Sequence, residues 1–586
     1  MWPPDSSCQL LLRSLYRTLP QRRRRQAWLT LALMLLGAVA EVLSVGAILP
    51  FISIVANPGQ AVRIPLIGGW IGQLPQGNEL VSITAVAFVF CASASAALRL
   101  ILTWVTHAFA FNASYDLSVE AFHRTISQPY RFYISSNSGE IIAGFEKIHA
   151  ITYGVLLSGV QALVSSVIAI VLFVFLFSLD PVIALTAATI LVGSYVLVSL
   201  AVRGPLARNS QIVAFCWGER IKRIQEALGG IRDILIDSSQ GVFEGDFRAS
   251  AQRLSKAATV NAYIGVSPKI VIEAIGMVLI AGLAWYMARQ PGGLASAIPV
   301  LAGLGLGAQR LLPQLQISYV GWSQVLGSTQ NLVDVLRLAQ LPEPPAWPEA
   351  ATSAPRFSRA IRLSNVSFGY DPRRLILHQI DLEIGKGERL GIVGKTGSGK
   401  STLVDLVLGL LEPDHGQILI DGIPLSADLR RGWQTQVAHV PQVIYLADDT
   451  VAANIAFGQQ HNAIEMDRVR KAARSAGIAS FIESLPDRYL ARCGERGVRF
   501  SGGQRQRIGI ARALYKKARV LVMDEATSAL DTKTERAVME AISQLASDIT
   551  VILIAHRLST LVGCDRIIQL EGGAVQSIVI SAAELV

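Results

Sequence analysis

The residues with the clearest chemistry lie at 394–402, Gly-Lys-Thr-Gly-Ser-Gly-Lys-Ser-Thr. This stretch matches G-x-x-x-x-G-K-[ST], follows an apolar run typical of a strand and precedes one typical of a helix. In that position the glycines let several backbone N–H groups point at a phosphate, and the helix adds the positive end of its dipole. Lys400 is predicted to reach the β- and γ-phosphates, and Ser401 to ligate Mg²⁺. The stretch therefore predicts a site for a nucleoside triphosphate.

Two carboxylates downstream could complete the chemistry of phosphate transfer to water. Asp524 and Glu525 end the apolar run 520–523. In this arrangement the first carboxylate supports Mg²⁺ and the second acts as general base toward water. Gln442, in Val-Pro-Gln, is placed to bridge Mg²⁺ or the attacking water to the domain surface. An apolar-Asp-Glu run alone is weak, but after a phosphate loop it predicts hydrolysis, with Ser401, Gln442 and Asp524 around the metal.

The remaining site candidates extend the nucleotide contacts. His556 follows an apolar strand, where a neutral imidazole can hydrogen-bond the γ-phosphate. Residues 501–504 precede a predicted helix and supply further backbone amides for phosphate. Tyr370 is placed to stack on adenine. The residues predicted to contact ATP are Tyr370, Gly394, Thr396, Gly397, Ser398, Gly399, Lys400, Ser401, Thr402, Ser501, Gly502, Gly503 and Gln504.

The composition indicates a membrane protein. Hydrophobic residues make up 51% of the 586 residues and charged residues 16%, and the mean hydropathy is +0.42, whereas soluble domains average about 25% charged residues. The five cysteines have no C-x-x-C spacing, so neither a zinc site nor a disulfide framework is indicated. The net charge of +10 comes without interleaved aromatic residues. Anionic lipid headgroups therefore explain it better than nucleic acid.

Six apolar runs are long enough to span a bilayer, at about 27–56, 81–109, 155–179, 181–202, 270–288 and 294–317. The first run is too long for a cleaved signal peptide. It follows four arginines at 22–25, which places the N-terminus in the cytoplasm. Six spans return the chain to that side, so the ATPase domain is also cytoplasmic. An amphipathic segment near residues 10–16 could lie on the membrane surface, and an outer segment at 62–74 predicts a short interfacial helix or a plain loop.

Two cations, Arg99 and Arg310, fall inside these runs, and Lys269 lies at the inner start of the fifth run. At about 1.5 Å rise per residue, Arg99, Lys269 and Arg310 share one layer on the cytoplasmic side of the membrane. Intramembrane charges are costly and point to function, here a basic site for a phosphate-bearing substrate. The alternative is that the side chains reach lipid headgroups, with Glu273 neutralising Lys269 one turn away.

The chain is predicted to contain a transmembrane domain at 1–340, a linker at 341–356 and a nucleotide domain at 357–586. The linker is rich in proline and breaks every periodicity. The two long inner connections of the membrane half are expected to reach the ATPase domain at their turning points, near 128–132 and 237–243.

Over about 357–575, motif order and spacing resemble an ATP-binding cassette. The motifs, in order, are Tyr370, residues 394–402, Gln442, Ser501–Gln504, Asp524 with Glu525, Asp531 and His556. The resemblance implies a membrane α-helical domain of six long helices of the ABC exporter type, fused to an α/β P-loop nucleotide-binding domain. Residues 494–497 resemble the X-loop of ABC exporters, and Phe500 replaces the usual leucine before the signature. In this family the signature of one cassette closes over the phosphate loop of another, which implies a homodimer of half-transporters.

The membrane half resembles bacterial flippases of lipid-linked oligosaccharides. The similarity rests on Glu41 to Ile52, residues 97–100, residues 268–276 and the run to Arg310. It implies a bacterial inner-membrane protein that flips a polyprenyl-pyrophosphate oligosaccharide, with Arg99, Lys269 and Arg310 at the pyrophosphate. Lys269 stands where arginine is typical, which keeps the charge but loses bidentate geometry.

Other functions remain open. The nearest alternative is an exporter of another lipid, such as a lipid A-like molecule, or of a drug or peptide. A channel or regulator is a different class, against which the intact Glu525 argues. A soluble, nucleic-acid-associated cassette ATPase is excluded by the predicted spans.

Overall fold

A computed structural model of the chain describes residues 8–56, 78–179, 181–288, 293–343, 356–371, 373–525, 540, 549–555, 561 and 563–579. The chain forms two compact units. The helical unit contains Met1–Gln128 and Ser136–Glu343, and the sheet unit contains Pro129–Ser135 and Pro344–Val586. The predicted outer segment at 62–74 lies outside the described residues.

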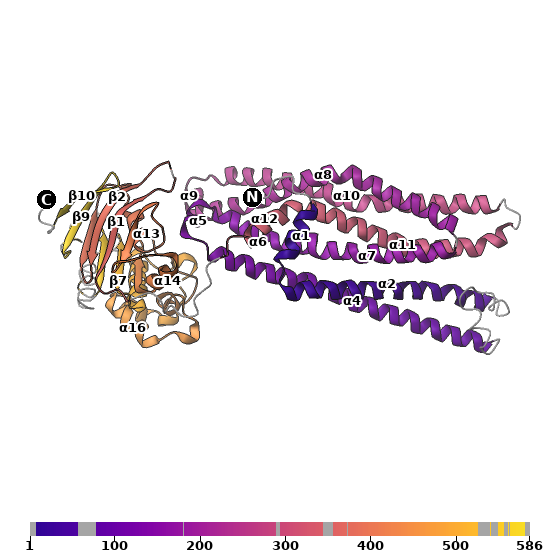
Figure 1. Ribbon diagram of the computed structural model, residues 1–586, viewed down its shortest axis with the longest axis horizontal. Coiled ribbons are helices and arrows are strands. Elements are labelled where there is room, and N and C mark those ends of the chain that lie inside the picture. The colour runs from indigo at the N-terminus through magenta and orange to yellow at the C-terminus, as the bar shows by residue number, and fades with distance from the viewer. Residues whose placement is uncertain are drawn as a thin grey trace. The chain divides into compact units, whose positions relative to one another are not determined.

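The helical unit is built from long helices that run alongside one another (Figure 1). Its elements are α1 (Cys8–Thr18), α2 (Gln21–Ala56), α4 (Asn78–Ile126), α6 (Ser138–Ile151), the π-helix η2 (Thr152–Leu157), α7 (Ser158–Leu179), α8 (Pro181–Gly229), α9 (Ile231–Ile236), α10 (Gln240–Ala288), α11 (Gly293–Gly327) and α12 (Thr329–Ala339). Helices α4, α8 and α10 have 49 residues each. At about 1.5 Å per residue each is more than twice as long as the roughly 30 Å hydrocarbon core of a bilayer.

The described part of the helical unit contains three segments long and apolar enough to cross a membrane. They are Val81–Ile126, Ser138–Phe177 and Thr189–Gly229. The first lies on α4, the third on α8, and the second runs from α6 through η2 into α7. The count of six spans stays a prediction.

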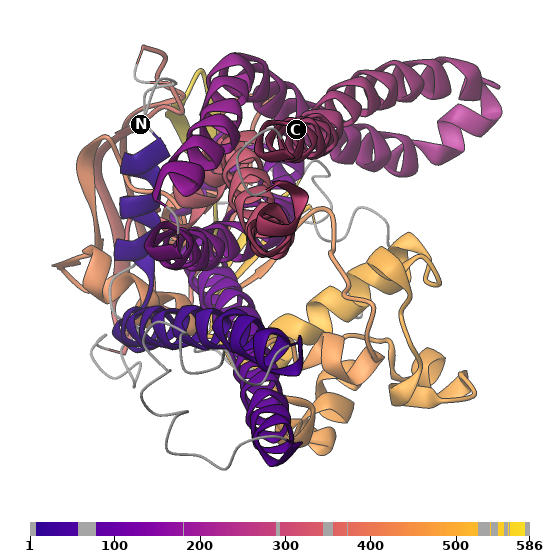
Figure 2. The same cartoon turned by 90° about the vertical axis from the view of Figure 1, so that its right-hand side faces the viewer.

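The long helices pack in pairs: α2 with α4, α7 with α11, and α8 with α10. The α7–α11 pair is close because Gly321 lies against α7: a Cβ there would be 2.4 Å from the Ser158 carbonyl oxygen. Part of the α8–α10 hairpin projects beyond the other helices of the unit (Figure 2), and both of its helices also contact α11. Large apolar side chains on this hairpin are exposed, among them Leu197, Tyr263 and Val278.

The first helix, α1, is amphipathic, as its sequence predicts, but it packs inside the helical unit. Leu11 and Leu15 are buried in a cluster that includes Leu332 and Leu336 of α12. The Gln340 side chain also donates a hydrogen bond to the Ser14 hydroxyl (2.7 Å). Helix α12 therefore covers part of this apolar face, and the expected position of α1 on the membrane surface stays a prediction.

The sheet unit contains two sheets. Its elements are α5 (Tyr130–Ser135), β1 (Ala360–Phe368), β2 (Leu377–Gly385), β3 (Arg389–Val393), α13 (Lys400–Val407), β4 (His415–Ile420), β5 (Ile423–Pro424), α14 (Ala427–Gln436), β6 (Val437–Val440), α15 (Val451–Ile455), η3 (His461–Ala463), α16 (Met466–Ser475), α17 (Ala479–Ser484), η4 (Arg488–Leu490), η5 (Glu495–Gly497), α18 (Gly502–Lys516), β7 (Val520–Asp524), β8 (Thr550–Ile554), β9 (Arg566–Glu571) and β10 (Ala574–Val579).

The larger sheet has the strand order β10-β9-β3-β8-β7-β6, and the smaller one has the order β2-β1-β4-β5. Strands β9, β3, β8, β7 and β6 pair in parallel. Their carboxyl ends therefore share one edge of the sheet, which is where open α/β sheets bind ligands. One apolar core joins α13 to both sheets, and a second lies under α15, α16, α17 and α18. The core thus fixes α13 at the end of β3.

Candidate functional site

The phosphate loop lies between β3 and α13 and requires glycine at its bends. Gly399, the residue before α13, has φ +99°, and a Cβ there would be 2.7 Å from Leu377. At Gly394 a Cβ would be 2.3 Å from the Leu570 carbonyl oxygen. Other residues therefore cannot replace these two without moving the loop. The loop geometry agrees with the phosphate-binding turn that the sequence predicts.

Two polar groups in this loop fit an anion. The Lys400 ammonium donates to the carbonyl oxygens of Gly394 (2.7 Å) and Lys395 (3.0 Å), so it lies across the loop and is largely buried. The Ser398 hydroxyl is buried and, within the described residues, has no hydrogen-bond partner. Buried polar groups without partners are rare in folded proteins and mark places where a ligand can bind. The loop can therefore hold the phosphates of ATP.

The acidic pair lies at the end of β7, on the same sheet edge as the loop. The Ser401 hydroxyl is 3.4 Å from the Asp524 Oδ2. A hydroxyl and a carboxylate in this arrangement are oxygen ligands of the kind that Mg²⁺ prefers. The described residues contain no cluster of three or more His, Cys, Asp or Glu side chains that could hold a metal ion alone. A magnesium ion here would therefore need the nucleotide phosphates as further ligands.

Glu525 follows Asp524 in a strained conformation. Its φ is +49°, in the left-handed region, which is uncommon outside glycine and clusters at functional sites. Its backbone N–H donates to the Ile554 carbonyl oxygen (3.0 Å), which ties this turn to β8. The Gln442 amide donates to the Glu525 carboxylate at 2.7 Å. Gln442 and Glu525, the two side chains predicted to act on the attacking water, therefore contact each other in the structure.

Asp405 was not among the residues predicted from the sequence. It lies one turn after Ser401 on α13, and burial together with the nearby Asp524 carboxylate raises its pKa to about 6. Two carboxylates close together at the mouth of the loop increase the attraction for a cation there. The spacing of four residues from Ser401 was a usable signal, because it puts both side chains on one helix face.

Tyr370 lies beside the loop. Its hydroxyl is 3.4 Å from that of Thr402, and its ring contacts Phe368 edge to face with 5.2 Å between centroids. The side chain is 37% exposed, which leaves a ring face open for a base. This position suits the predicted adenine contact.

The short helix α5 contacts the backbone at Tyr370. Arg131 donates to the carbonyl oxygens of Gly369 (3.2 Å) and Tyr370 (3.4 Å) and forms an ion pair with Asp414 (3.4 Å). Its guanidinium also lies 5.7 Å from the Phe368 ring centroid. The expectation that the turning point near 128–132 contacts the nucleotide domain is confirmed by these contacts. Arg131 itself was missed, because its type and position in a polar turn do not single it out.

The predicted signature, Ser501–Gln504, begins α18. The Ser501 hydroxyl accepts from the Gln504 backbone N–H (3.3 Å), and the Gln504 side chain accepts from the Ser501 N–H (2.8 Å). This capping box fixes the helix start and leaves Ser501 exposed. Helix α18 packs on α15, α16 and β6. His556 and Asp531 lie outside the described residues.

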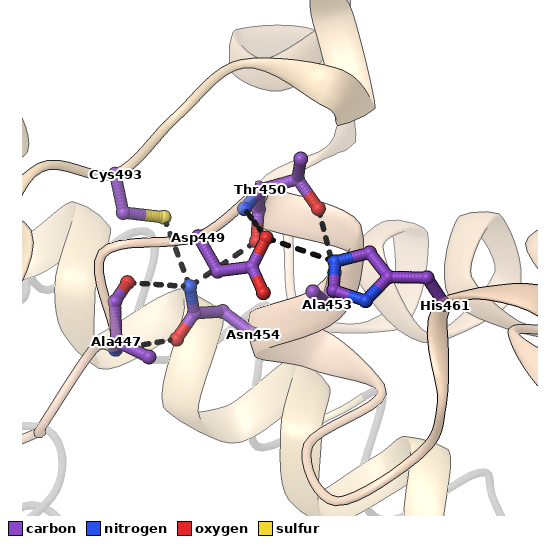
Figure 3. A network of polar contacts seen from close by, with 7 residues as sticks. All are labelled: Ala447, Asp449, Thr450, Ala453, Asn454, His461 and Cys493. Atoms are coloured by element: carbon purple, nitrogen blue, oxygen red, sulfur yellow. Dashed lines mark hydrogen bonds and ion pairs between the residues drawn. The ribbon is translucent and has the colours of Figure 1, made fainter. Parts of the chain in front are cut away.

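A buried polar network connects the segment after Gln442 to the segment before the X-loop-like residues (Figure 3). The Asn454 side chain is its centre and is bonded to the Ala447 backbone N–H and carbonyl (2.9 and 3.0 Å), the Thr450 carbonyl (3.1 Å), the Cys493 thiol (3.3 Å) and Arg512 (3.1 Å). Burial raises the pKa of Cys493 to about 11, so this thiol is protonated and structural. The network therefore fixes the segment around Ala447 and Thr450 against the segment at Cys493.

In the helical unit, the structure brings together two of the three predicted intramembrane cations. Arg310 donates to Glu41 Oε1 at 2.9 Å, and Arg99 lies 3.3 Å from Glu41 Oε2. Glu41 comes from α2, Arg99 from α4 and Arg310 from α11. Lys269 lies 3.8 Å from Glu273 on its own helix. The neutralisation of Lys269 that the sequence left open is thus observed.

Comparisons with known proteins agree with this architecture. Family profiles described as ABC transporter transmembrane region and ABC transporter match residues 31–290 and 377–528. The chain is 32% identical over 482 residues to an ATP-dependent lipid A-core flippase of Chromohalobacter salexigens, covering 80% of each chain. The chain belongs to the ABC exporter family.

Two further proteins support this membership. One is the ATP-dependent lipid A-core flippase of Ralstonia nicotianae, which is 32% identical over 477 residues and covers 78% of each chain. The other is a solved structure of a bacterial Atm1-family ABC exporter with ATP bound, which has 25% identity and a TM-score of 0.79 and covers 96% of each chain.

Several predictions about this exporter are thereby confirmed. The chain is a half-transporter with a helical membrane domain and an ABC nucleotide-binding domain, and it couples ATP hydrolysis to transport across a membrane. A half-transporter has one cassette, so it works as a dimer. The substrate class preferred in the sequence analysis is not supported: the relatives favour the alternative, a lipid A-like molecule, over a lipid-linked oligosaccharide.

Proposed function

We propose that two copies of this chain use ATP and Mg²⁺ to flip a phosphate-bearing glycolipid of the lipid A-core type across the inner membrane of a bacterium. The similarity to two lipid A-core flippases over about four fifths of the chain carries this proposal. The paired guanidiniums of Arg99 and Arg310 support it, because arginine is the preferred partner of phosphate.

In the ATPase step, the chain's residues have separate roles. Lys400 and the loop amides hold the phosphates, and Tyr370 takes the adenine. Ser401 and Asp524 would hold Mg²⁺, which would supply positive charge next to the phosphates. Glu525 accepts the proton of the attacking water, and Gln442 orients that carboxylate through the 2.7 Å hydrogen bond.

The other half of each site comes from the second copy. Ser501–Gln504 of that copy close over the γ-phosphate. His556 donates a further hydrogen bond to the γ-phosphate. The exposed position of Ser501 supports this, since an occupied helix start would bury it. Every motif in the chain is intact, so a homodimer with two active sites is the simplest assembly.

A second candidate substrate is a polyprenyl-pyrophosphate oligosaccharide. The specific observation in its favour is that Arg99 and Arg310 share one carboxylate. A pyrophosphate carries two adjacent phosphates, which suit two adjacent guanidiniums. The N-terminus and the ATPase domain are proposed to lie in the cytoplasm, on the side of the basic cluster at 22–25.

Flipping by reconstituted protein tests the proposal. Proteoliposomes receive one fluorescent lipid at a time: a lipid A-core glycolipid, a polyprenyl-pyrophosphate oligosaccharide, or a neutral phospholipid. ATP-dependent movement is compared with that of Glu525→Gln, which retains ATP binding and loses hydrolysis. Movement of the lipid A-core glycolipid alone supports the proposal. Movement of only the pyrophosphate lipid favours the second candidate, and movement of only the neutral lipid contradicts both.

A further inference from the structure

Glu41 is a carboxylate inside the first predicted span that no motif of the ATPase explains. Its side chain is 4% exposed. Helix α2 carries the basic cluster at 22–25 in its first turns, and the rest of the helix is largely apolar. A charge in such a place is costly unless it is paired, and intramembrane acids are rare outside functional sites. Both carboxylate oxygens are within ion-pair distance of an arginine, at 2.9 Å for Arg310 and 3.3 Å for Arg99.

The surrounding helices hold this carboxylate in place. Ala38, one turn before Glu41, is fully buried in a cluster that includes Leu172 of α7 and Leu311 of α11. On the α4 side, a Cβ on Gly37 would be 3.0 Å from Leu102. Helix α2 is therefore packed against α4, α7 and α11 next to Glu41. The carboxylate cannot move into solvent without separating these helices.

The two arginines, in contrast, are accessible. Arg99 is 42% exposed and Arg310 is 38% exposed. A guanidinium has five N–H donors, and a carboxylate in this position engages only part of each. The two side chains come from different helices, and more than a third of each is exposed. The arrangement is a buried acceptor with two basic groups in front of it.

We propose that Glu41 is the positioning residue of an anion site in the membrane unit: its buried carboxylate holds the Arg99 and Arg310 guanidiniums side by side, so that their free N–H groups bind one phosphate group of the lipid. This inference rests on the proposed function, since it assumes a phosphate-bearing substrate. It adds a specific geometry, because two like charges do not stay together without a shared counter-ion.

Lys269 is not part of this arrangement. It forms an ion pair with Glu273 on the same helix at 3.8 Å, and both side chains are nearly half exposed. No buried group in the described residues joins this pair to Glu41. The membrane site therefore depends on Arg99 and Arg310, and Lys269 is not part of it.

A simple charge argument makes the opposite prediction, and this allows a decisive test. If Glu41 acted only as a negative charge near the site, Glu41→Gln would strengthen anion binding. If Glu41 positions the arginines, Glu41→Gln weakens binding, because the two guanidiniums repel each other and lose their shared acceptor. The glutamine side chain has nearly the same size, so the packing of α2 is preserved.

The experiment measures binding of bisphosphorylated lipid A to the full chain in nanodiscs, with a monophosphorylated form as a second ligand. For Glu41→Gln we expect about tenfold weaker binding, or about 1.4 kcal/mol. The control Glu120→Gln removes a carboxylate of α4 that is 40% exposed and paired with Arg124, and it should leave affinity within about twofold. Equal or tighter binding by Glu41→Gln overturns the proposal.

A double-mutant cycle shows whether Glu41 acts through the arginines. In the Arg99→Gln/Arg310→Gln background, the further change Glu41→Gln should have no effect on affinity, since there is nothing left to position. An equal tenfold loss in that background means that Glu41 acts through the fold instead, and it overturns the inference. ATP binding by each variant confirms that the chain is folded.

The same measurements separate this inference from the proposed function. If the wild-type chain binds no phosphorylated glycolipid and Arg99→Gln/Arg310→Gln changes nothing, the proposed substrate class fails and the inference fails with it. If binding depends on the two arginines and Glu41→Gln leaves it unchanged, only the role of Glu41 is wrong.

Discussion

Arg131→Ala is expected to separate ATP hydrolysis from transport. Arg131 connects α5 to the backbone at the predicted adenine contact, through bonds to the carbonyls of Gly369 and Tyr370. In the sequence, α5 lies between α4 and α6, so it carries a link from the membrane helices to the nucleotide domain. Arg131 contacts no residue that holds the phosphates. Its loss should therefore weaken the link and leave the chemistry of hydrolysis intact.

The size of the effect follows from the contacts. Arg131 is 46% exposed, so its 3.4 Å ion pair with Asp414 contributes about 0.5 kcal/mol. The two long hydrogen bonds and the contact with the Phe368 ring each contribute a similar amount at a partly exposed site. These terms are not additive, and about 1–2 kcal/mol is a reasonable total. This corresponds to a roughly 5- to 30-fold weaker docking of α5.

The assay compares lipid flipped and ATP hydrolysed in the same proteoliposomes. For Arg131→Ala, lipid flipped per ATP should fall several-fold, with the KM for ATP within about threefold of wild type. Arg131→Lys keeps the charge but not the fork of donors, and it should give an intermediate ratio. An unchanged ratio of transport to hydrolysis in Arg131→Ala would refute the reasoning. A large rise in KM without uncoupling would also refute it, since it assigns Arg131 to nucleotide binding.

Three further changes test other parts of the cassette. The pKa of Asp405 is raised from 3.8 to about 6 in the folded chain, so the free energy of unfolding falls as pH rises from about 4 to 6 and stays lower above pH 6. The Asp405→Asn variant without nucleotide should gain about 1 kcal/mol of stability at pH 7.5, after discounting for partial exposure. Its melting temperature should also change less between pH 4 and 6 than that of the wild type. Asn454→Ala removes the centre of a buried network and should cost about 3 kcal/mol, seen as a melting temperature roughly 5–10 °C lower, whereas an unchanged value would make the network dispensable. Lys400→Ala and Ser501→Arg chains should each be inactive alone but recover about a quarter of wild-type ATPase when coexpressed, because half the dimers then have one intact composite site; no recovery contradicts sites shared between copies.

The place of the phosphate loop between a strand and a helix could be predicted because its pattern is local, and the nucleotide contacts of its residues stay predictions. A phosphate loop needs its glycines, lysine and hydroxyl within a few residues, and the strand and helix around it are consecutive in the chain. Gly394, Lys400 and Ser401 accordingly lie where the sequence put them. Gln442 and Glu525 are far apart in sequence, and they were assigned through motif order alone. Their 2.7 Å contact depends on the order of strands β7 and β6, which no local pattern encodes.

Asp405 and Arg131 were missed for different physical reasons. Asp405 is a polar residue on a helix. Its raised pKa depends on burial of its side chain and on the nearby Asp524 carboxylate at the end of β7. Arg131 is an ordinary basic residue in a turn. Its contacts are to backbone carbonyls, which carry no sequence signature. The fold class, in contrast, follows from long apolar runs and from strands in which apolar and polar residues alternate, because these patterns decide which residues are buried.

The membrane cluster shows the limit of depth arguments most clearly. The rise per residue placed Arg99 and Arg310 in one layer, but it gives no rotation about each helix, so it could not say which cations meet. Glu41 changes the electrostatics of that layer. The two guanidiniums repel each other, and the shared Glu41 carboxylate offsets this repulsion. With Glu41 and Glu273 included, five charged groups leave a single net positive charge. In the proposed function, recognition of a phosphate must then come from the directed N–H groups of the paired arginines. Attraction by net charge alone is weak, and it would not distinguish the proposed substrate from other anionic lipids.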